Sequence, residues 1–170
     1  AAAGSRKQHG TVGAFDVDML SPSAVEPRNG GPTKIVVTFD DDVQAADGSL
    51  DIDDEVTVSG ASISQLTLLC DELTIELTGA ADQSCVSVTL HGLALLSDAT
   101  AIMPDRVLKV AVLFCDVNGD GVVNEDDEYV IIAGILQPVN SSTCRLDVDV
   151  DGDIDNIDAL LVKVRMGTPG

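Results

Sequence analysis

Over its first two thirds the chain alternates apolar and polar residues in short runs. Phe15, Val17 and Met19 alternate with Asp16 and Asp18, the period-two pattern of a half-buried strand. Further β-rich runs, separated by turn residues, cover 35–39, 55–58, 63–69, 73–78, 86–91 and 107–114. Short strands at this spacing predict an antiparallel, Ig-like β-sandwich, and we expect no long helix before residue 120.

The first ten residues break this pattern, because they are small and polar and include Arg6, Lys7 and His9. We therefore expect a flexible or exchanged arm. The strand that follows it would be free to add to the sheet edge of a neighbouring molecule, a known mode of association. The predicted residues of this assembly strand are Phe15, Val17 and Met19.

Beyond Phe114 the spacing of apolar residues becomes helical. The first predicted helix has Asn124 as its N-cap and carries on one face Tyr129, Ile132, Ala133 and Leu136. The second begins at Asp155, stops at Gly167, and carries Ile157, Leu160, Leu161 and Val164. This change predicts two domains, an N-terminal arm with a β-sandwich over 1–113 and a helical domain over 114–170.

Two acidic stretches of twelve residues lead into these helices, with first aspartates 31 residues apart. Calcium takes six to eight oxygen ligands, and such a loop supplies them from positions 1, 3, 5, 7, 9 and 12, with glycine at position 6. The first loop offers Asp116, Asn118, Asp120, the Val122 carbonyl, Asn124 and Asp127. The second offers Asp147, Asp149, Asp151, the Asp153 carbonyl, Asp155 and Asp158. Two such matches predict two bound calcium ions.

Neither loop has a helix before it, since 107–114 reads as a strand and 137–142 contains a proline within a polar run. Two loop–helix units in tandem resemble the dockerin family. The upstream stretches 13–17, 38–39, 77–83 and 86–90 resemble a bacterial Ig-like β module. The resemblance implies a calcium-binding docking domain preceded by a β module.

In cellulosomal dockerins, loop positions 10 and 11 contribute to the recognition of cohesin and are often small hydroxyl residues. In this chain they are Glu125-Asp126 and Asn156-Ile157. The basic residues that the family carries on its first helix are also missing. The expected contact positions therefore differ from those of the cellulosomal members.

Composition narrows the classes of partner. Apolar residues make up 45% of the 170 residues, enough for a core, whereas aromatic residues make up 2%, which disfavours a sugar-binding role. The net charge of −20 repels phosphate backbones and anionic lipids, so we expect no nucleic-acid or membrane partner. No apolar run approaches the roughly 20 residues that span a bilayer.

The four cysteines, Cys70, Cys85, Cys115 and Cys144, include no Cys-x-x-Cys pair. An even number without that pair favours disulfides over zinc, and their positions suggest Cys70–Cys85 and Cys115–Cys144. The alternative is four free thiols. Disulfides would imply an oxidising compartment, and the small residues at 1–5 suit a terminus left by signal cleavage, so we expect an extracellular, bacterial protein.

Two functions remain open at this point, and neither is enzymatic, because no triad, paired-acid or catalytic-metal pattern stands out. One is a secreted structural protein that associates with copies of itself, through the N-terminal strand, into filaments. The other is an attachment module that docks a larger secreted protein onto a cohesin-like partner. In both, calcium would be structural.

Overall fold

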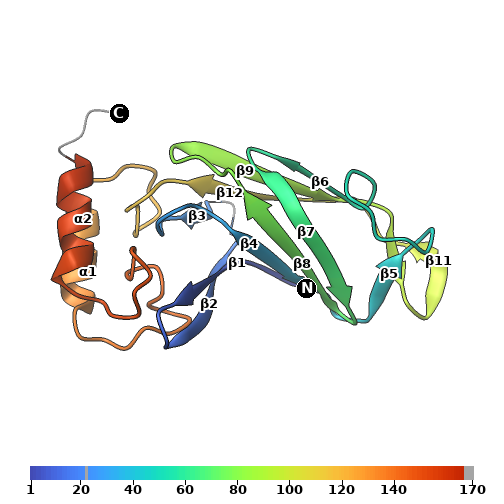
Figure 1. The fold of residues 1–170 in the computed structure, drawn as a ribbon, viewed down its shortest axis with the longest axis horizontal. Coiled ribbons are helices and arrows are strands. Elements are labelled where there is room, and N and C mark those ends of the chain that lie inside the picture. Colours follow the sequence, from blue (N-terminus) through green and yellow to red (C-terminus); the bar gives the residue numbers. More distant parts are fainter. Residues whose placement is uncertain (22, 167–170) are drawn as a thin grey trace.

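The computed structural model of the chain describes residues 1–21 and 23–166. Strands occupy the chain as far as residue 112, and two helices follow. Figure 1 shows an elongated molecule with the helices at one end, two larger sheets in the middle and a small sheet at the other end. The expected class, mainly β with a small C-terminal helical part, is confirmed.

The largest sheet has five antiparallel strands in the order β2-β1-β4-β8-β7. Their bounds are Gly13–Asp18, Ala2–His9, Lys34–Thr38, Glu72–Thr78 and Ser62–Leu69. The second sheet has the order β3-β12-β9-β6, with bounds Val25–Glu26, Arg106–Val112, Ser84–Leu90 and Val56–Ser59. The third has the order β11-β10-β5, with bounds Asp98–Ile102, Leu93–Leu95 and Val43–Ala45. β3 and β12 pair in parallel, an exception to the expected antiparallel arrangement.

The two larger sheets enclose one hydrophobic core. Every second residue of their strands points inward, as the period of a strand dictates. The buried side chains include Ile35, Val37, Leu73, Ile75, Leu77, Val86, Val88, Leu108, Val110 and Val112. Burying such a side chain stabilises a fold by about 1.5–3 kcal/mol, so this layer accounts for most of the driving force of the β part.

The prediction of a flexible arm over residues 1–10 is wrong. These residues form β1, which lies between β2 and β4 and pairs with both. Their side chains are small or polar, so they lack the apolar alternation by which a buried strand is recognised. Ser5, Lys7 and His9 are nevertheless buried, because their polar groups find partners inside the protein.

Phe15 and Val17 of the predicted strand lie in β2 and Met19 follows its end, but β2 extends this chain's own sheet. Val17 and Met19 are each 3% exposed and pack into the hydrophobic clusters of the same molecule. The outer side of β2 also faces the C-terminal part, where the Cys144 thiol donates to the Asp16 carbonyl at 3.7 Å. The proposed role of this strand in assembly between molecules is therefore not supported.

The helices are α1, Glu125–Gly134, and α2, Asn156–Met166, and they pack against each other. Asn124 caps α1 as predicted, accepting the Asp126 N–H, while the Asp127 side chain accepts the Asn124 N–H. The predicted stop at Gly167 lies outside the described residues. Neither helix, within the described part of the chain, is long and apolar enough to cross a membrane.

The two predicted disulfides are absent, and all four cysteines are free thiols. Cys85 lies beside Gly60, at one end of β7, and Cys70 follows the other end of this eight-residue strand. The two are therefore about 25 Å apart, far beyond the roughly 7 Å that a bridge allows between Cα atoms. Cys115 and Cys144 are buried, and burial raises the pKa of both thiols, that of Cys115 to about 12.

Thiol reactivity tests this arrangement. In the native protein we expect the two exposed cysteines to react with Ellman's reagent and the two buried ones to stay protonated and unreactive. All four should react after unfolding without reductant. Cys70→Ser should remove one native reactive group. Fewer than four thiols in the unfolded, unreduced protein would contradict the structure and restore a disulfide.

Candidate metal centre

Both acidic loops turn sharply at their sixth residue. Gly121 has φ 87° and Gly152 has φ 104°, in the left-handed region that side chains disfavour. Each glycine N–H then points back to the first aspartate of its loop. Gly121 donates to Asp116 Oδ2 and Gly152 donates to Asp147 Oδ2, both at 2.9 Å. The two loops therefore share the same turn.

Further hydrogen bonds repeat from loop to loop. The side chains at positions 3 and 5 each accept the N–H group two residues further on, at 2.8 Å and 2.8 Å in the first loop and 3.3 Å and 3.0 Å in the second. These four side chains belong to Asn118, Asp120, Asp149 and Asp151. Bonds of this kind hold each oxygen in place, so the loops are organised by their own backbone.

The aspartate at position 12 closes each loop. Asp127 accepts two backbone N–H groups, of Asn118 at 3.1 Å and Asn124 at 3.0 Å. Asp158 accepts the corresponding N–H groups of Asp149 at 3.5 Å and Asp155 at 2.9 Å, and also that of Val148 at 2.8 Å. One carboxylate thus joins the start of the loop to the start of its helix, which explains how the shorter aspartate fills a place where glutamate is usual.

The aspartates at positions 1 and 12 are buried in both loops: Asp116, Asp127, Asp147 and Asp158. Burial raises the pKa of Asp116 and Asp149, and it raises the pKa of Asp158 to about 6. The folded protein thus disfavours the ionised form of these groups. Buried carboxylates need a positive charge nearby, and a cation in each loop would supply it.

The donor set fits calcium. The loops offer carboxylate, amide and carbonyl oxygens, the ligands of a hard cation. The carboxylates of Asp147, Asp149 and Asp151 place one oxygen each within 4.8 Å of the others. Three of the predicted ligand residues of the second loop are therefore brought together, and the predicted donors of both loops are oxygen atoms.

A second acidic cluster, Asp47, Asp54 and Glu55, lies in the β part. Glu55 there accepts the N–H of Asp51 at 2.8 Å, so its carboxylate supports a loop of the backbone. Nothing further in the cluster points to an ion.

Residues 115–167 match the family model of the dockerin type I domain. The match supports a dockerin domain at the C-terminal end of the chain. Such domains generally bind calcium and are non-catalytic modules that typically bind cohesin partners. No curated protein and no solved structure matches the chain, so the β part is described by its own geometry alone.

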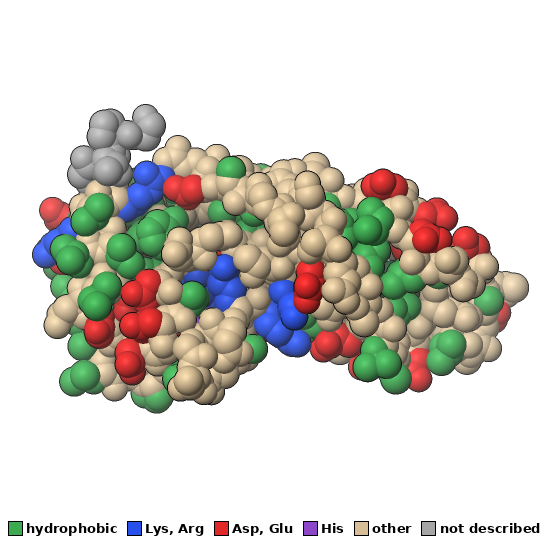
Figure 2. Space-filling model, viewed as in Figure 1, with side chains coloured by type: hydrophobic (Ala, Val, Ile, Leu, Met, Phe, Trp, Pro, Cys, Tyr) green, Lys and Arg blue, Asp and Glu red, His purple; other side chains and the backbone are tan. Residues whose placement is uncertain are grey.

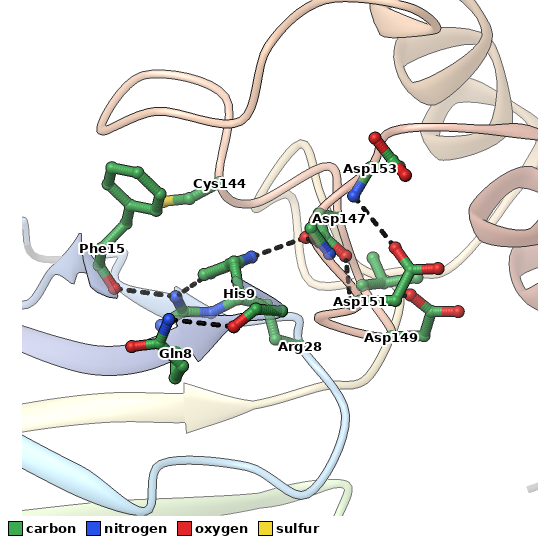
Figure 3. Close-up of polar contacts among 12 residues, drawn as sticks. Gln8, His9, Phe15, Arg28, Cys144, Asp147, Asp149, Asp151 and Asp153 are labelled. Atoms are coloured by element: carbon green, nitrogen blue, oxygen red, sulfur yellow. Dashed lines mark hydrogen bonds and ion pairs between the residues drawn. The ribbon is translucent and has the colours of Figure 1, made fainter. Parts of the chain in front are cut away.

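One group of residues at the second loop has no recognisable pattern in the sequence. His9 Nδ1 lies 2.8 Å from Asp147 Oδ2, and Arg28 Nη1 lies 3.0 Å from His9 Nε2 (Figure 3). His9 stands in the polar N-terminal run, and Arg28 stands in a turn. Their partner is more than a hundred residues away in the chain, so only folding brings them to the loop.

Calcium titration of the full chain tests the two loops. We expect the protein to bind two ions and Asp116→Ala and Asp147→Ala each to lose one, because position 1 contributes a buried ligand. Asp54→Ala, in the other acidic cluster, is the matched control and should leave two. Retention of both ions in either loop variant would exclude the assignment.

Acidification should weaken calcium binding. Calcium requires the ionised carboxylate, and with a pKa of about 6 Asp158 is mostly protonated at pH 5 and ionised at pH 7. The affinity of the second loop should therefore fall about tenfold between pH 7 and pH 5. Calorimetry at pH 6 in buffers of different ionisation enthalpy should show proton release on binding. Equal affinities at the two pH values would contradict the raised pKa.

Proposed function

We propose that this chain is a calcium-dependent attachment module. Its C-terminal domain, residues 114–170, docks onto a cohesin-like protein and so anchors a larger secreted, extracellular bacterial protein. Residues 1–113 form an Ig-like β-sandwich that supports this domain. The chain itself performs no catalysis. The family match at 115–167 and the surface of the two helices support this function.

The surface of the helices carries the proposal. The face expected to be apolar from the sequence points to solvent in both helices. Its exposed large residues are Tyr129, Ile132, Ile157, Leu160 and Val164, with Leu136 just beyond α1; Val130 is exposed beside them, whereas Leu161 packs against the second hydrophobic cluster. Figure 2 shows apolar side chains over the end of the molecule that carries the helices (left), interspersed with acidic ones. Exposed apolar groups at this density mark a surface for another protein.

The opposite side of each helix is fully used inside the molecule. Ile131 of α1 and Val162 of α2 are 0% exposed and pack into the second hydrophobic cluster together with Ile154 and Val148 of the second loop. Lys163 of α2 also pairs with Glu128 of α1 at 2.8 Å. The helices are thus fixed from behind, and their apolar outer surface cannot turn inward.

Calcium controls this surface because each helix begins inside a loop. We assign the first ion to Asp116, Asn118, Asp120, the Val122 carbonyl, Asn124 and Asp127. We assign the second to Asp147, Asp149, Asp151, the Asp153 carbonyl, Asp155 and Asp158. Without the ions the crowded carboxylates repel one another, and the helices lose the loops that orient them.

The partner is expected to differ from cellulosomal cohesins in its contact residues. Loop positions 10 and 11 are acidic in the first unit, Glu125 and Asp126, so a complementary partner would present basic groups there. The apolar residues around them would supply most of the binding energy.

Docking can be measured with immobilised cohesin domains of different types, in calcium and after chelation. We expect binding in the presence of calcium and none after chelation. Tyr129→Ser and Leu160→Ser should each weaken binding at least about tenfold, which corresponds to about 1.4 kcal/mol, since both side chains lie on the exposed face.

Leu69→Ser and Ile102→Ser are matched controls, because these exposed apolar residues lie on the β part. They should bind like the unchanged chain. If no cohesin domain binds and the chain instead dimerises in calcium through the helices, as sizing would show, self-association rather than attachment is the function.

A further inference from the structure

The turn that joins β1 and β2 packs directly on the second loop. The Gly10 N–H donates to the Val150 carbonyl at 2.9 Å, and the Asn29 N–H donates to the Val148 carbonyl at 2.7 Å. A Cβ on Gly10 would lie 1.9 Å from the Asp151 carbonyl oxygen, so the approach leaves no room for a side chain. The β part and the second loop are therefore in contact along the backbone.

One buried side chain crosses this contact. His9 is the last residue of β1 and is 0% exposed, as is Asp147, the first residue of the loop. His9 Nδ1 lies 2.8 Å from Asp147 Oδ2. Figure 3 shows the imidazole between Arg28 and the carboxylate of Asp147, with the other aspartates of the loop beyond it.

Arg28 fixes which nitrogen of His9 carries the proton. A guanidinium can only donate, so His9 Nε2, 3.0 Å from Arg28 Nη1, must accept. The proton of the neutral ring is then on Nδ1, and it is donated to Asp147. Histidines beside metal sites are commonly oriented in this way by a second hydrogen bond.

Arg28 is itself held rigidly. It forms two bonds with the Glu26 carboxylate, from Nε and Nη2, both at 2.7 Å. It also donates to the carbonyls of Ser5 at 2.6 Å and Phe15 at 3.0 Å. Because this paired guanidinium is completely buried, it holds the imidazole of His9 in one orientation.

The first loop offers an internal comparison. Asp116 Oδ2 accepts the Gly121 N–H, just as Asp147 Oδ2 accepts that of Gly152. Among the described residues, Asp147 Oδ2 accepts a further hydrogen bond from an imidazole, that of His9, whereas Asp116 Oδ2 does not. With Oδ2 occupied by two donors, Asp147 Oδ1, which accepts the Asp151 N–H at 3.1 Å, is left as the oxygen with spare capacity.

We propose that the second calcium site is assembled from both parts of the chain, with His9 as the positioning residue that orients Asp147 through its Oδ2. Calcium at this loop then stabilises the contact between β1 and the helical domain, whereas, among the described residues, no side chain of the β part bonds to a predicted ligand of the first loop. The inference rests on calcium binding in the second loop, but it is independent of any docking partner.

Two isosteric variants of the full chain separate the hydrogen bond from packing. Asn has a side-chain N–H where His has Nδ1, so His9→Asn keeps the donor to Asp147. Leu has the same branched shape without a donor. Each His9 variant is combined with Asp116→Ala, so that only the second loop can bind calcium, or with Asp147→Ala, so that only the first loop can. Calcium affinity is then measured in each double variant.

We expect His9→Leu to weaken the second site about 10- to 100-fold, the usual effect of removing such a supporting partner, and to leave the first site unchanged. His9→Asn should retain most of the affinity. Circular dichroism at saturating calcium checks that each variant is folded. Should His9→Leu not fold, the proposal stands or falls on His9→Asn retaining the second site.

Three results would overturn the inference: an unchanged second site in folded His9→Leu, an equal loss at both sites, or an equal loss in the Asn and Leu variants. A chain carrying Asp116→Ala alone that binds no calcium would instead contradict the assignment of the second loop as a calcium site. The two failures are thus distinguishable.

Discussion

Four buried aspartates set the constraint on which the C-terminal half depends. Asp116 and Asp147 open the two loops, and Asp127 and Asp158 close them, all away from solvent. Backbone N–H groups hold these carboxylates in place, but hydrogen bonds alone do not offset the cost of burying ionised groups, as the raised pKa of Asp158 shows. A cation in each loop, as proposed above, would resolve the conflict. The helices begin at these loops, so their positions follow from the same electrostatic requirement.

The second constraint is the buried polar chain that runs from Glu26 through Arg28 and His9 to Asp147. Each member is satisfied only if the strand, the turn and the loop are all in their native places, so the network favours one arrangement of the two halves over others. It also explains why a polar segment such as β1 occupies an interior position of a sheet. The buried Ser5 and His9 side chains of β1 hydrogen-bond within this network and do not pack into an apolar core.

The apolar faces of the two helices are present as the sequence indicates, but they are exposed to solvent. An apolar face normally packs on a core, yet the faces with Tyr129 in α1 and Leu160 in α2 are exposed. Their inner faces instead use the closing aspartates and a few apolar residues, Ile131 and Val162 among them, so little apolar surface suffices for packing. The larger apolar face stays exposed, which is consistent with the match to a docking domain.

The sequence by itself determined the features that depend on local spacing: the matching turns of the two acidic loops, the Asn124 cap, and most strands of the sheets, because turn chemistry and periodicity act over a few residues. Tertiary structure decided what depends on distant neighbours. It placed β1 inside a sheet, paired β2 within its own chain, kept Cys70 and Cys85 on opposite ends of a strand as free thiols, and brought His9 to Asp147. None of these leaves a local pattern, because each is stabilised by groups that meet only after the chain has folded.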